Sequence, residues 1–289
     1  MIKNLVLAGA AIRTISILGA ISHMEDNNKL VLSKVDNFIG SSGGSIICYL
    51  LSMGYDIKMS FTIITKLMMV YNKTNTDPNC IFNLFGSFGL DNGEFLTKWV
   101  LDTTFDKLKL NNPTFIEFAK ATGKNLSVCA TNISKMKLTM FNVNNTPNIK
   151  VSDAIRASIS IPLLFTPVII NEDYYVDSGV LNNFPIDFVD FTSLSRFDTI
   201  GLCIKINTAD GKIPNIIAYA QQIFVTVSNN NSINNPLLNK KNIRIIEIHV
   251  DDSNMFLNFN FDSFKMALTS DILTNYFNIG YAHMSSEEG

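Results

Sequence analysis

The sequence predicts an α/β fold with a mostly parallel central sheet flanked by helices. Residues 4–8 and 35–39 are short apolar runs of strand length, and residues 12–24 between them space their apolar side chains as a helix does. A strand, a helix and a second strand in that order form a βαβ unit, whose two strands lie parallel. The alternation of strand-like and helix-like segments continues along the chain.

The later segments extend this pattern with one exception. Residues 72–93 are rich in turn-forming residues although they include Phe82, Phe85 and Phe88, and we expect a long loop or cap there. With no internal repeat or linker, residues 1–289 should form one domain, in which 1–190 carry the motifs, 191–283 complete the fold and 284–289 are a short polar tail. The expected helices cover 43–52, 56–71, 94–105, 114–121, 213–228 and 263–282, the last capped by Asp262 or Ser263, and the expected strands cover 126–131, 138–142, 174–176, 199–206 and 243–250.

Composition indicates a globular protein and argues against several partners. Hydrophobic residues make up 47% of the 289 residues and charged residues 17%, which is enough apolar material for a large core. A formal net charge of -2, without any run of Lys or Arg, argues against nucleic acid as a partner. The four cysteines lack C-x-x-C spacing and Arg13 interrupts the apolar N-terminal run, so we expect a cytoplasmic protein without a signal peptide. Oligomeric state is not indicated.

The candidate nucleophile is Ser42, in the sequence Gly40-Ser41-Ser42-Gly43-Gly44. An expected strand precedes it and an apolar helix follows, which is the context that a G-x-S-x-G nucleophile elbow requires. Gly40 and Gly44 allow the strand and the helix to approach closely, and the helix N-terminus favours developing negative charge. Without this context, the motif would indicate only an ordinary strand-to-helix turn.

A serine nucleophile needs a base, and histidine is the usual one. The order Ser42, Asp177 and then His249 or His283 would suit an α/β-hydrolase triad. In that fold, however, several strands precede the elbow, whereas at most two precede Ser42. His23 and His249 also lie within an expected helix and strand, where structural roles are common.

Asp177 is the other candidate base. It follows the expected strand 174–176 and precedes the small residues Ser178 and Gly179, so that its carboxylate can point to the end of the sheet where sites in α/β folds collect. Considered alone, Asp177 would be a turn-capping aspartate. A carboxylate of ordinary pKa is a weak base for a serine, so burial must raise its pKa or the proton must move in concert with attack.

These segments together resemble the patatin-like phospholipase family. Its glycine-rich loop, G-G-G-x-R/K-G, is matched by Gly9-Ala10-Ala11-Ile12-Arg13-Thr14, its elbow by the segment around Ser42, and its D-G-G/A motif by Asp177-Ser178-Gly179. The stretch 154–168 also resembles the family, so that the similarity covers most of residues 1–190. The resemblance implies a patatin-type sandwich and a Ser42–Asp177 dyad that hydrolyses lipid acyl esters without metal or organic cofactor. It further implies an oxyanion hole formed by Gly9, Ala10 and Ala11, supported by Arg13, Gly40, Gly44 and Gly179.

The loop departs from the family pattern at three positions. Ala10, Ala11 and Thr14 stand where the family has glycine. Alanine keeps its N–H donor but resists positive φ, so the resemblance implies reduced or absent activity. Arg13 keeps the family's basic character, and it either braces the loop, contacts a lipid phosphate or lies on a helix surface.

Two aromatic stretches, 82–88 and 255–264, have two interpretations. They are either interfacial anchors at a bilayer or core packing, and the 21 Phe residues favour core packing.

The hypothesis is a phospholipase A-like lipid acyl hydrolase that forms an acyl-enzyme on Ser42, with Asp177 as general base and with peripheral membrane contact. One alternative is a catalytically weakened lipid-binding or regulatory protein of the same fold. Another is a serine acyltransferase, or an esterase acting on other substrates.

Overall fold

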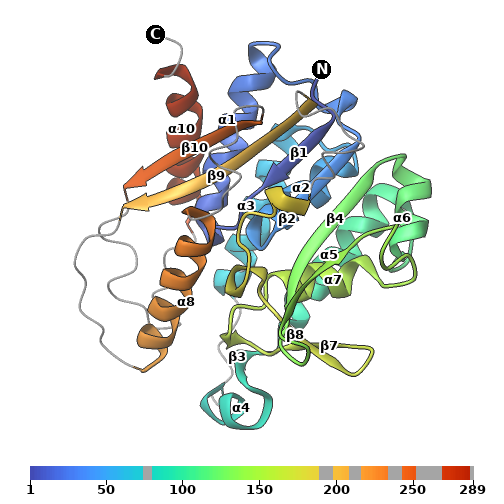
Figure 1. Cartoon of the computed structure of the whole chain (residues 1–289), viewed down its shortest axis with the longest axis vertical. Coiled ribbons are helices and arrows are strands. Elements are labelled where there is room, and N and C mark those ends of the chain that lie inside the picture. Colours follow the sequence, from blue (N-terminus) through green and yellow to red (C-terminus); the bar gives the residue numbers. More distant parts are fainter. Residues whose placement is uncertain (74–79, 189–197, 208–215, 234–242, 252–268, 287–289) are drawn as a thin grey trace.

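An eight-stranded sheet forms the centre of the computed structural model, in the order β10-β9-β1-β2-β4-β8-β7 with β5 paired to β4 (Figure 1). The structure describes residues 1–73, 80–188, 198–207, 216–233, 243–251 and 269–286. Strands β10, β9, β1, β2 and β4 run parallel, whereas β5, β8 and β7 are antiparallel to their neighbours. The predicted α/β class with a mostly parallel sheet is therefore confirmed. The strands of this sheet are β1 (Asn4–Leu7), β2 (Asn37–Ser41), β4 (Asn125–Asn132), β5 (Lys137–Phe141), β7 (Val168–Ile170), β8 (Asp173–Val176), β9 (Thr199–Asn207) and β10 (Arg244–Asp251).

Helices pack along the sheet and over its end. In Figure 1, α1, α2 and α3 lie behind β1 and β9, and α10 packs along α1. A two-stranded ribbon of β3 (Gly89–Asp91) and β6 (Leu163–Phe165) stands apart from the main sheet. The helices are α1 (Ile15–Asp26), α2 (Gly43–Ser52), α3 (Ile57–Lys73), α4 (Cys80–Ser87), α5 (Glu94–Leu108), α6 (Phe115–Thr122), α7 (Val151–Ser158), α8 (Ile216–Ile233) and α10 (Ser270–Ser286), with 3-10 turns η1 (Ala11–Thr14), η2 (Leu32–Lys34), η3 (Ser178–Val180) and η4 (Ile186–Phe188).

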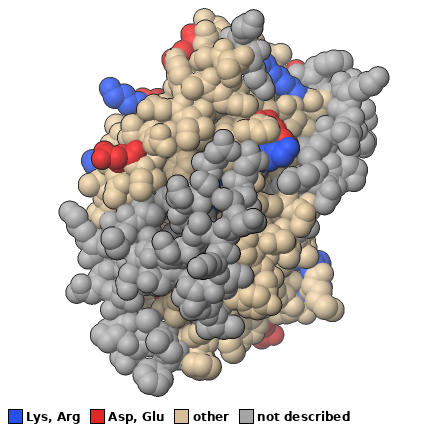
Figure 2. Space-filling model, turned by 90° about the vertical axis from the view of Figure 1, so that its left-hand side faces the viewer, with Lys and Arg blue, Asp and Glu red and all other residues tan. Residues whose placement is uncertain are grey.

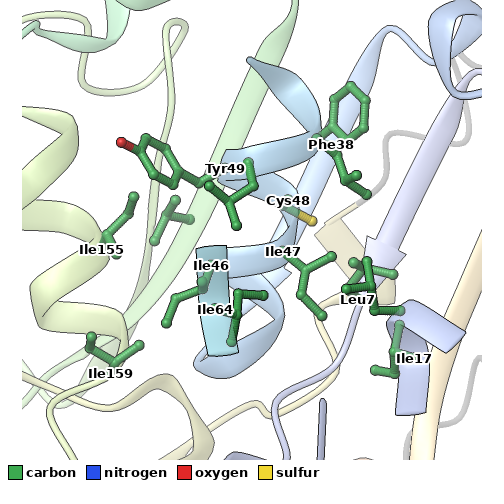
Figure 3. Close-up of a cluster of buried hydrophobic side chains, with 14 of the residues drawn as sticks. Leu7, Ile17, Phe38, Ile46, Ile47, Cys48, Tyr49, Ile64, Ile155 and Ile159 are labelled. Atoms are coloured by element: carbon green, nitrogen blue, oxygen red, sulfur yellow. The ribbon is translucent and has the colours of Figure 1, made fainter. Parts of the chain in front are cut away.

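Side chains alternate along β1, and both faces of this central strand are buried. Leu5 and Leu7 belong to the main core under the helices, whereas Val6 and Ala8 face a smaller cluster that Phe184 closes. Figure 3 shows the main core, where Ile46 and Ile47 of α2 meet Ile64 of α3 and Ile159 at the end of α7, with Leu7 and Ile17 beside them. This packing fixes α2, and hence the turn that precedes it.

Several elements differ from the sequence-based expectations. The segment 72–93 contains α4 and β3 rather than only a loop. Residues 74–79 of this segment lie outside the described residues. Helix α4 is only eight residues long and β3 pairs with a distant partner, so neither leaves a clear periodic signal. Helix α10 runs to Ser286 and buries Met284, so the first half of the predicted tail is helical. The predicted caps Asp262 and Ser263 lie outside the described residues.

Within the described residues, no helix combines the length and the apolar character that crossing a bilayer requires. On the face shown in Figure 2, the described basic and acidic side chains are interspersed rather than gathered into a basic patch.

Candidate active site

Ser42 lies on a sharp turn between β2 and α2. Its backbone has φ 49° and ψ -128°, a conformation that stores strain in a non-glycine residue. The turn is tight: a Cβ on Gly40 would lie 2.5 Å from Ser45 Cα, and one on Gly44 would lie 2.5 Å from the Ala8 carbonyl oxygen. The predicted elbow is therefore present, and both glycines are required by close backbone approach.

The Ser42 backbone is held by two other serines. Its N–H group donates to Ser158 Oγ at 2.9 Å and to Ser178 Oγ at 3.0 Å. Ser178 Oγ also shares a hydrogen bond of 2.7 Å with Ser41 Oγ. These contacts hold the strained turn in place. Sequence reasoning did not assign a role to Ser158 or Ser178, because a serine hydroxyl that accepts from a distant N–H leaves no local pattern.

The structure brings Asp177 to the nucleophile. Ser42 Oγ donates to Asp177 Oδ2 at 2.7 Å, and Asp177 Oδ1 accepts the Gly179 N–H at 2.8 Å. The Asp177 N–H in turn donates to the Ser160 carbonyl oxygen at 2.8 Å. Asp177 is fully buried, so its carboxylate is oriented by protein groups alone. Gly179 keeps the turn open for Asp177, since a Cβ there would lie 3.1 Å from Asp177 Oδ1.

Burial changes the proton affinity of this carboxylate. Loss of hydration raises the pKa of Asp177 from 3.8 to about 7, and the hydrogen bonds from Gly179 and Ser42 oppose that rise only in part. A group with a pKa near neutrality exchanges a proton readily in both directions. The buried carboxylate can therefore accept a proton from Ser42 and later return it.

The loop after β1 lies beside Ser42, because β1 and β2 are parallel neighbours and both end at the same edge of the sheet. The Gly9 N–H donates to the Asn183 carbonyl oxygen at 2.9 Å, so it is not available for a substrate oxygen, contrary to the prediction. Gly9 instead allows close packing, since a Cβ there would lie 2.7 Å from Ser42 Cβ. Ala11 has φ 50°, so alanine does adopt the left-handed conformation that we expected it to resist. Ala10, in contrast, has a negative φ of -162°.

An apolar slot opens beside Ser42. Its volume is about 90 Å³, below the 300 Å³ or more of pockets that hold drug-sized ligands, and its lining includes no Asp, Glu, Lys or Arg among the described residues. Such a slot suits an alkyl chain rather than a charged head group. The slot is lined by Ala11, Ile12, Thr14, Ile15, Ser42, Gly43, Ile46, Ile47, Ile64, Met68, Tyr71, Leu96, Ile159, Ile161, Phe165 and Leu273.

The other candidate residues occupy different positions. Arg13 is only 2% exposed, so the interpretation as a surface arginine is wrong. His23 packs edge-on against Tyr281, and His249 stacks on His283 with ring centroids 6.0 Å apart. Strands β9 and β1 separate the strand of His249 from that of Ser42. The geometry thus pairs Ser42 with Asp177 and not with these rings.

The aromatic stretch 82–88 is not buried where its side chains are described. Phe85 is 80% exposed and Phe88 is 57% exposed, so the core interpretation is wrong for these two residues. The second stretch, 255–264, lies outside the described residues. Among the described residues, no three His, Cys, Asp or Glu side chains gather as metal ligands would.

Comparison with known proteins places this chain in a family. The model of the family "Patatin-like phospholipase" matches residues 5–190. The chain is 34% identical over 189 residues to "Probable lipid hydrolase 463L" of Invertebrate iridescent virus 6, a match that covers 64% of this chain and 62% of that relative. It is 31% identical over 192 residues to an uncharacterized protein of Acanthamoeba polyphaga mimivirus, covering 65% of this chain and 62% of the relative.

A solved structure shows a similar fold. VipD from Legionella pneumophila superposes with a TM-score of 0.56 at 17% sequence identity, covering 98% of this chain and 66% of that chain. At this identity the likeness concerns the fold alone. The family match over residues 5–190 carries the assignment, and the chain belongs to the patatin-like phospholipase family.

Proposed function

We propose that this protein is a phospholipase A-like hydrolase that cleaves lipid acyl esters through an acyl-enzyme on Ser42. The observation that carries the proposal is the 2.7 Å hydrogen bond from Ser42 Oγ, in the lining of an apolar slot, to the buried Asp177 carboxylate. The acyl chain lies in the slot and the head group stays outside it. Family membership supports a lipid substrate, and the slot supports an acyl chain as the part that is recognised.

The first half-reaction transfers the acyl group to the enzyme. Ser42 Oγ attacks the ester carbonyl carbon while its proton passes to Asp177 Oδ2. The N–H groups of Ala10 and Ala11 stabilise the oxyanion, since the Gly9 N–H is bonded to Asn183. The C–O bond to the alcohol then breaks, and the alcohol leaves with the proton from Asp177. The pKa of about 7 lets Asp177 act as base and then as acid.

The second half-reaction reverses these roles with water. Asp177 accepts a proton from a water molecule whose oxygen attacks the acyl-enzyme carbonyl. The intermediate collapses to release the fatty acid, and Ser42 Oγ regains its proton from Asp177. Transfer to an alcohol in place of water would make the protein an acyltransferase, and product analysis with an added alcohol distinguishes the two.

The test is a lipid panel incubated with wild type, Ser42→Ala, Asp177→Asn and, as a matched control, His249→Gln. We expect fatty acid release by wild type and His249→Gln, and at least a 10³-fold loss in the other two variants. The combined variant should lose little more than either alone, because the two residues act as one unit. Wild-type turnover in Ser42→Ala would refute the proposal. A wild type that binds lipid, but neither turns it over nor reacts with a fluorophosphonate, would instead identify the lipid-binding alternative.

We also propose that the enzyme works peripherally, from the cytoplasmic side, at a lipid surface. Support comes from Phe85 and Phe88, whose rings are exposed on and just after α4. No charged residue occurs between Cys80 and Leu90, so this segment can enter the apolar edge of a bilayer without burying a charge.

A further inference from the structure

A buried arginine lies next to the dyad. Arg156, on α7, is 4% exposed, and its guanidinium makes three hydrogen bonds. Nη1 donates to Ser160 Oγ at 2.5 Å, while Nη2 donates to the carbonyl oxygens of Asn92 at 3.1 Å and Thr166 at 3.3 Å. The guanidinium carbon also lies 5.0 Å from the centre of the Phe165 ring. A buried cation without such partners would be costly, so these contacts define its position.

The three hydrogen bonds join two parts of the active site. Asn92 follows β3 and Thr166 follows β6, so Nη2 ties together the ends of the ribbon whose Phe165 lines the acyl slot. Ser160 lies on the other side, and its carbonyl oxygen accepts the Asp177 N–H at 2.8 Å. One planar side chain therefore touches both the wall of the slot and the residue that holds the base.

The surroundings are shaped to admit this side chain. Gly93 has φ 70°, and a Cβ there would lie 1.8 Å from Arg156 Nε, so only glycine leaves room for the guanidinium. Burial lowers the pKa of Arg156 to about 10, and the nearby Asp91 carboxylate opposes this change, so the side chain stays charged at neutral pH. Asp91 itself accepts the Tyr71 hydroxyl at 2.8 Å, and Tyr71 is a second wall of the slot.

We propose that Arg156 is a positioning residue for hydrolysis, which fixes Asp177 through Ser160 and fixes the acyl slot through the β3–β6 ribbon. This inference rests on the proposed function. Lysine cannot replace Arg156, because an ammonium group lacks the planar fork that reaches Ser160 and the two carbonyl oxygens together.

Three variants test separately the contact with Ser160 and the contacts with the β3–β6 ribbon: Arg156→Met, Arg156→Lys and Ser160→Ala. Turnover of a short soluble ester and of a long-chain ester is measured per active site titrated with a fluorophosphonate. We expect kcat to fall roughly 10- to 100-fold for both esters in the Arg156 variants, since a displacement of about 1 Å has effects of that size. Only the Arg156 variants should also raise KM for the long-chain ester. Ser160→Ala, which leaves the ribbon contacts of Arg156 in place, should lower kcat alone.

The matched control is Lys124→Met. Lys124 Nζ donates to the carbonyl oxygens of Ser33 at 3.0 Å and Val35 at 2.6 Å, at the opposite end of the sheet from Ser42. The Lys124→Met variant should have a lower free energy of unfolding but keep wild-type kcat per titrated site. The double variant Arg156→Met with Ser160→Ala should have no lower kcat than Arg156→Met alone, because both lie on one path to Asp177.

Specific outcomes would overturn the inference. Wild-type kcat per site in Ser160→Ala, or in a folded Arg156→Met, shows that Asp177 does not depend on this contact, and full activity in Arg156→Lys shows that charge alone suffices. If Arg156→Met does not fold, the kcat per titrated site of Ser160→Ala decides whether Asp177 depends on this contact. If Ser42→Ala stays active, the proposed function itself fails. If Ser42→Ala is inert while Ser160→Ala keeps wild-type kcat, only the role of Arg156 fails.

Discussion

In the proposed mechanism, burial of Asp177 serves the chemistry at the expense of stability. Within the part of the chain that the structure describes, Gly179 and Ser42 are the only donors to its carboxylate, and the pKa rises to about 7. The ionised form is therefore less stable in the fold than in water. Both activity and stability should depend on pH through this one group.

We expect kcat/KM on a soluble ester to rise about tenfold per pH unit below pH 7 and to level off above it, because Asp177 must be ionised to accept the Ser42 proton. The measurement is an initial-rate profile from pH 5 to 9, with an ester whose hydrolysis is followed directly. His249→Gln should give the same profile. A midpoint near 4 would show that the carboxylate is hydrated in the working enzyme.

Asp177→Asn should stabilise the protein increasingly as pH rises from about 4 to about 7. The folded wild type binds the Asp177 proton more tightly than the unfolded chain does, so this group's contribution is complete below pH 4 and is lost as pH rises through 7. The loss amounts to as much as about 4 kcal/mol for a shift from 3.8 to about 7. Urea unfolding of both proteins at several pH values measures the difference. A gap that does not change with pH would contradict this account.

At the scale of elements, the turn η1 shows how the loop tolerates residues other than glycine. Thr14 stands at a family glycine position, and its hydroxyl donates to the Ala11 carbonyl oxygen. Thr14 thereby holds Ala11 at φ 50°, where an alanine is strained. The departures from the family pattern compensate each other, so we expect little loss of activity from them.

Replacing Ala10 and replacing Ala11 with glycine should have opposite effects on the free energy of unfolding. Ala11→Gly relieves a left-handed residue and should raise the free energy of unfolding by up to about 1 kcal/mol, with kcat close to wild type. Ala10 has a negative φ of -162°, so Ala10→Gly relieves no strain and should lower the free energy of unfolding by roughly 0.5–1 kcal/mol. Chemical denaturation measures both. Equal effects of the two changes would mean that Ala11 is not strained in solution.

At the scale of the whole molecule, the uncharged segment Cys80–Leu90, which includes α4, bears on the proposed membrane contact. Helix α4 forms the lower tip in Figure 1, beyond the carboxyl ends of the parallel strands where Ser42 lies. Exposed rings at this end place the proposed membrane contact on the same side as the site.

Replacing Phe85 and Phe88 together with Ser should reduce co-sedimentation with phosphatidylcholine vesicles several-fold and leave soluble-ester turnover unchanged, because both rings are exposed. Phe105→Ser is the matched control. Phe105 is 47% exposed on α5, about 16 Å along that helix from its first turn, and its loss should not change binding. A fall in both soluble turnover and melting temperature would instead show that the α4 rings support the fold.

The sequence by itself determined the local parts of this site. The elbow at Ser42 and the turn at Asp177 are each decided within a few residues, because glycines and small residues permit what bulkier side chains forbid. The βαβ start was predictable for the same reason, since helix and strand periodicity is a short-range property.

Only the tertiary structure decided how these parts meet. Ser42 and Asp177 are 135 positions apart in the sequence, yet Ser42 Oγ and Asp177 Oδ2 lie 2.7 Å apart. Ser160, whose carbonyl oxygen accepts the Asp177 N–H, accepts a hydrogen bond at its hydroxyl from Arg156 of α7. The occupied N–H of Gly9 likewise depends on packing across the molecule. Hydrogen bonds between distant segments and the loss of hydration around a carboxylate arise from close packing of the whole chain, and they leave no periodic trace in the order of residues.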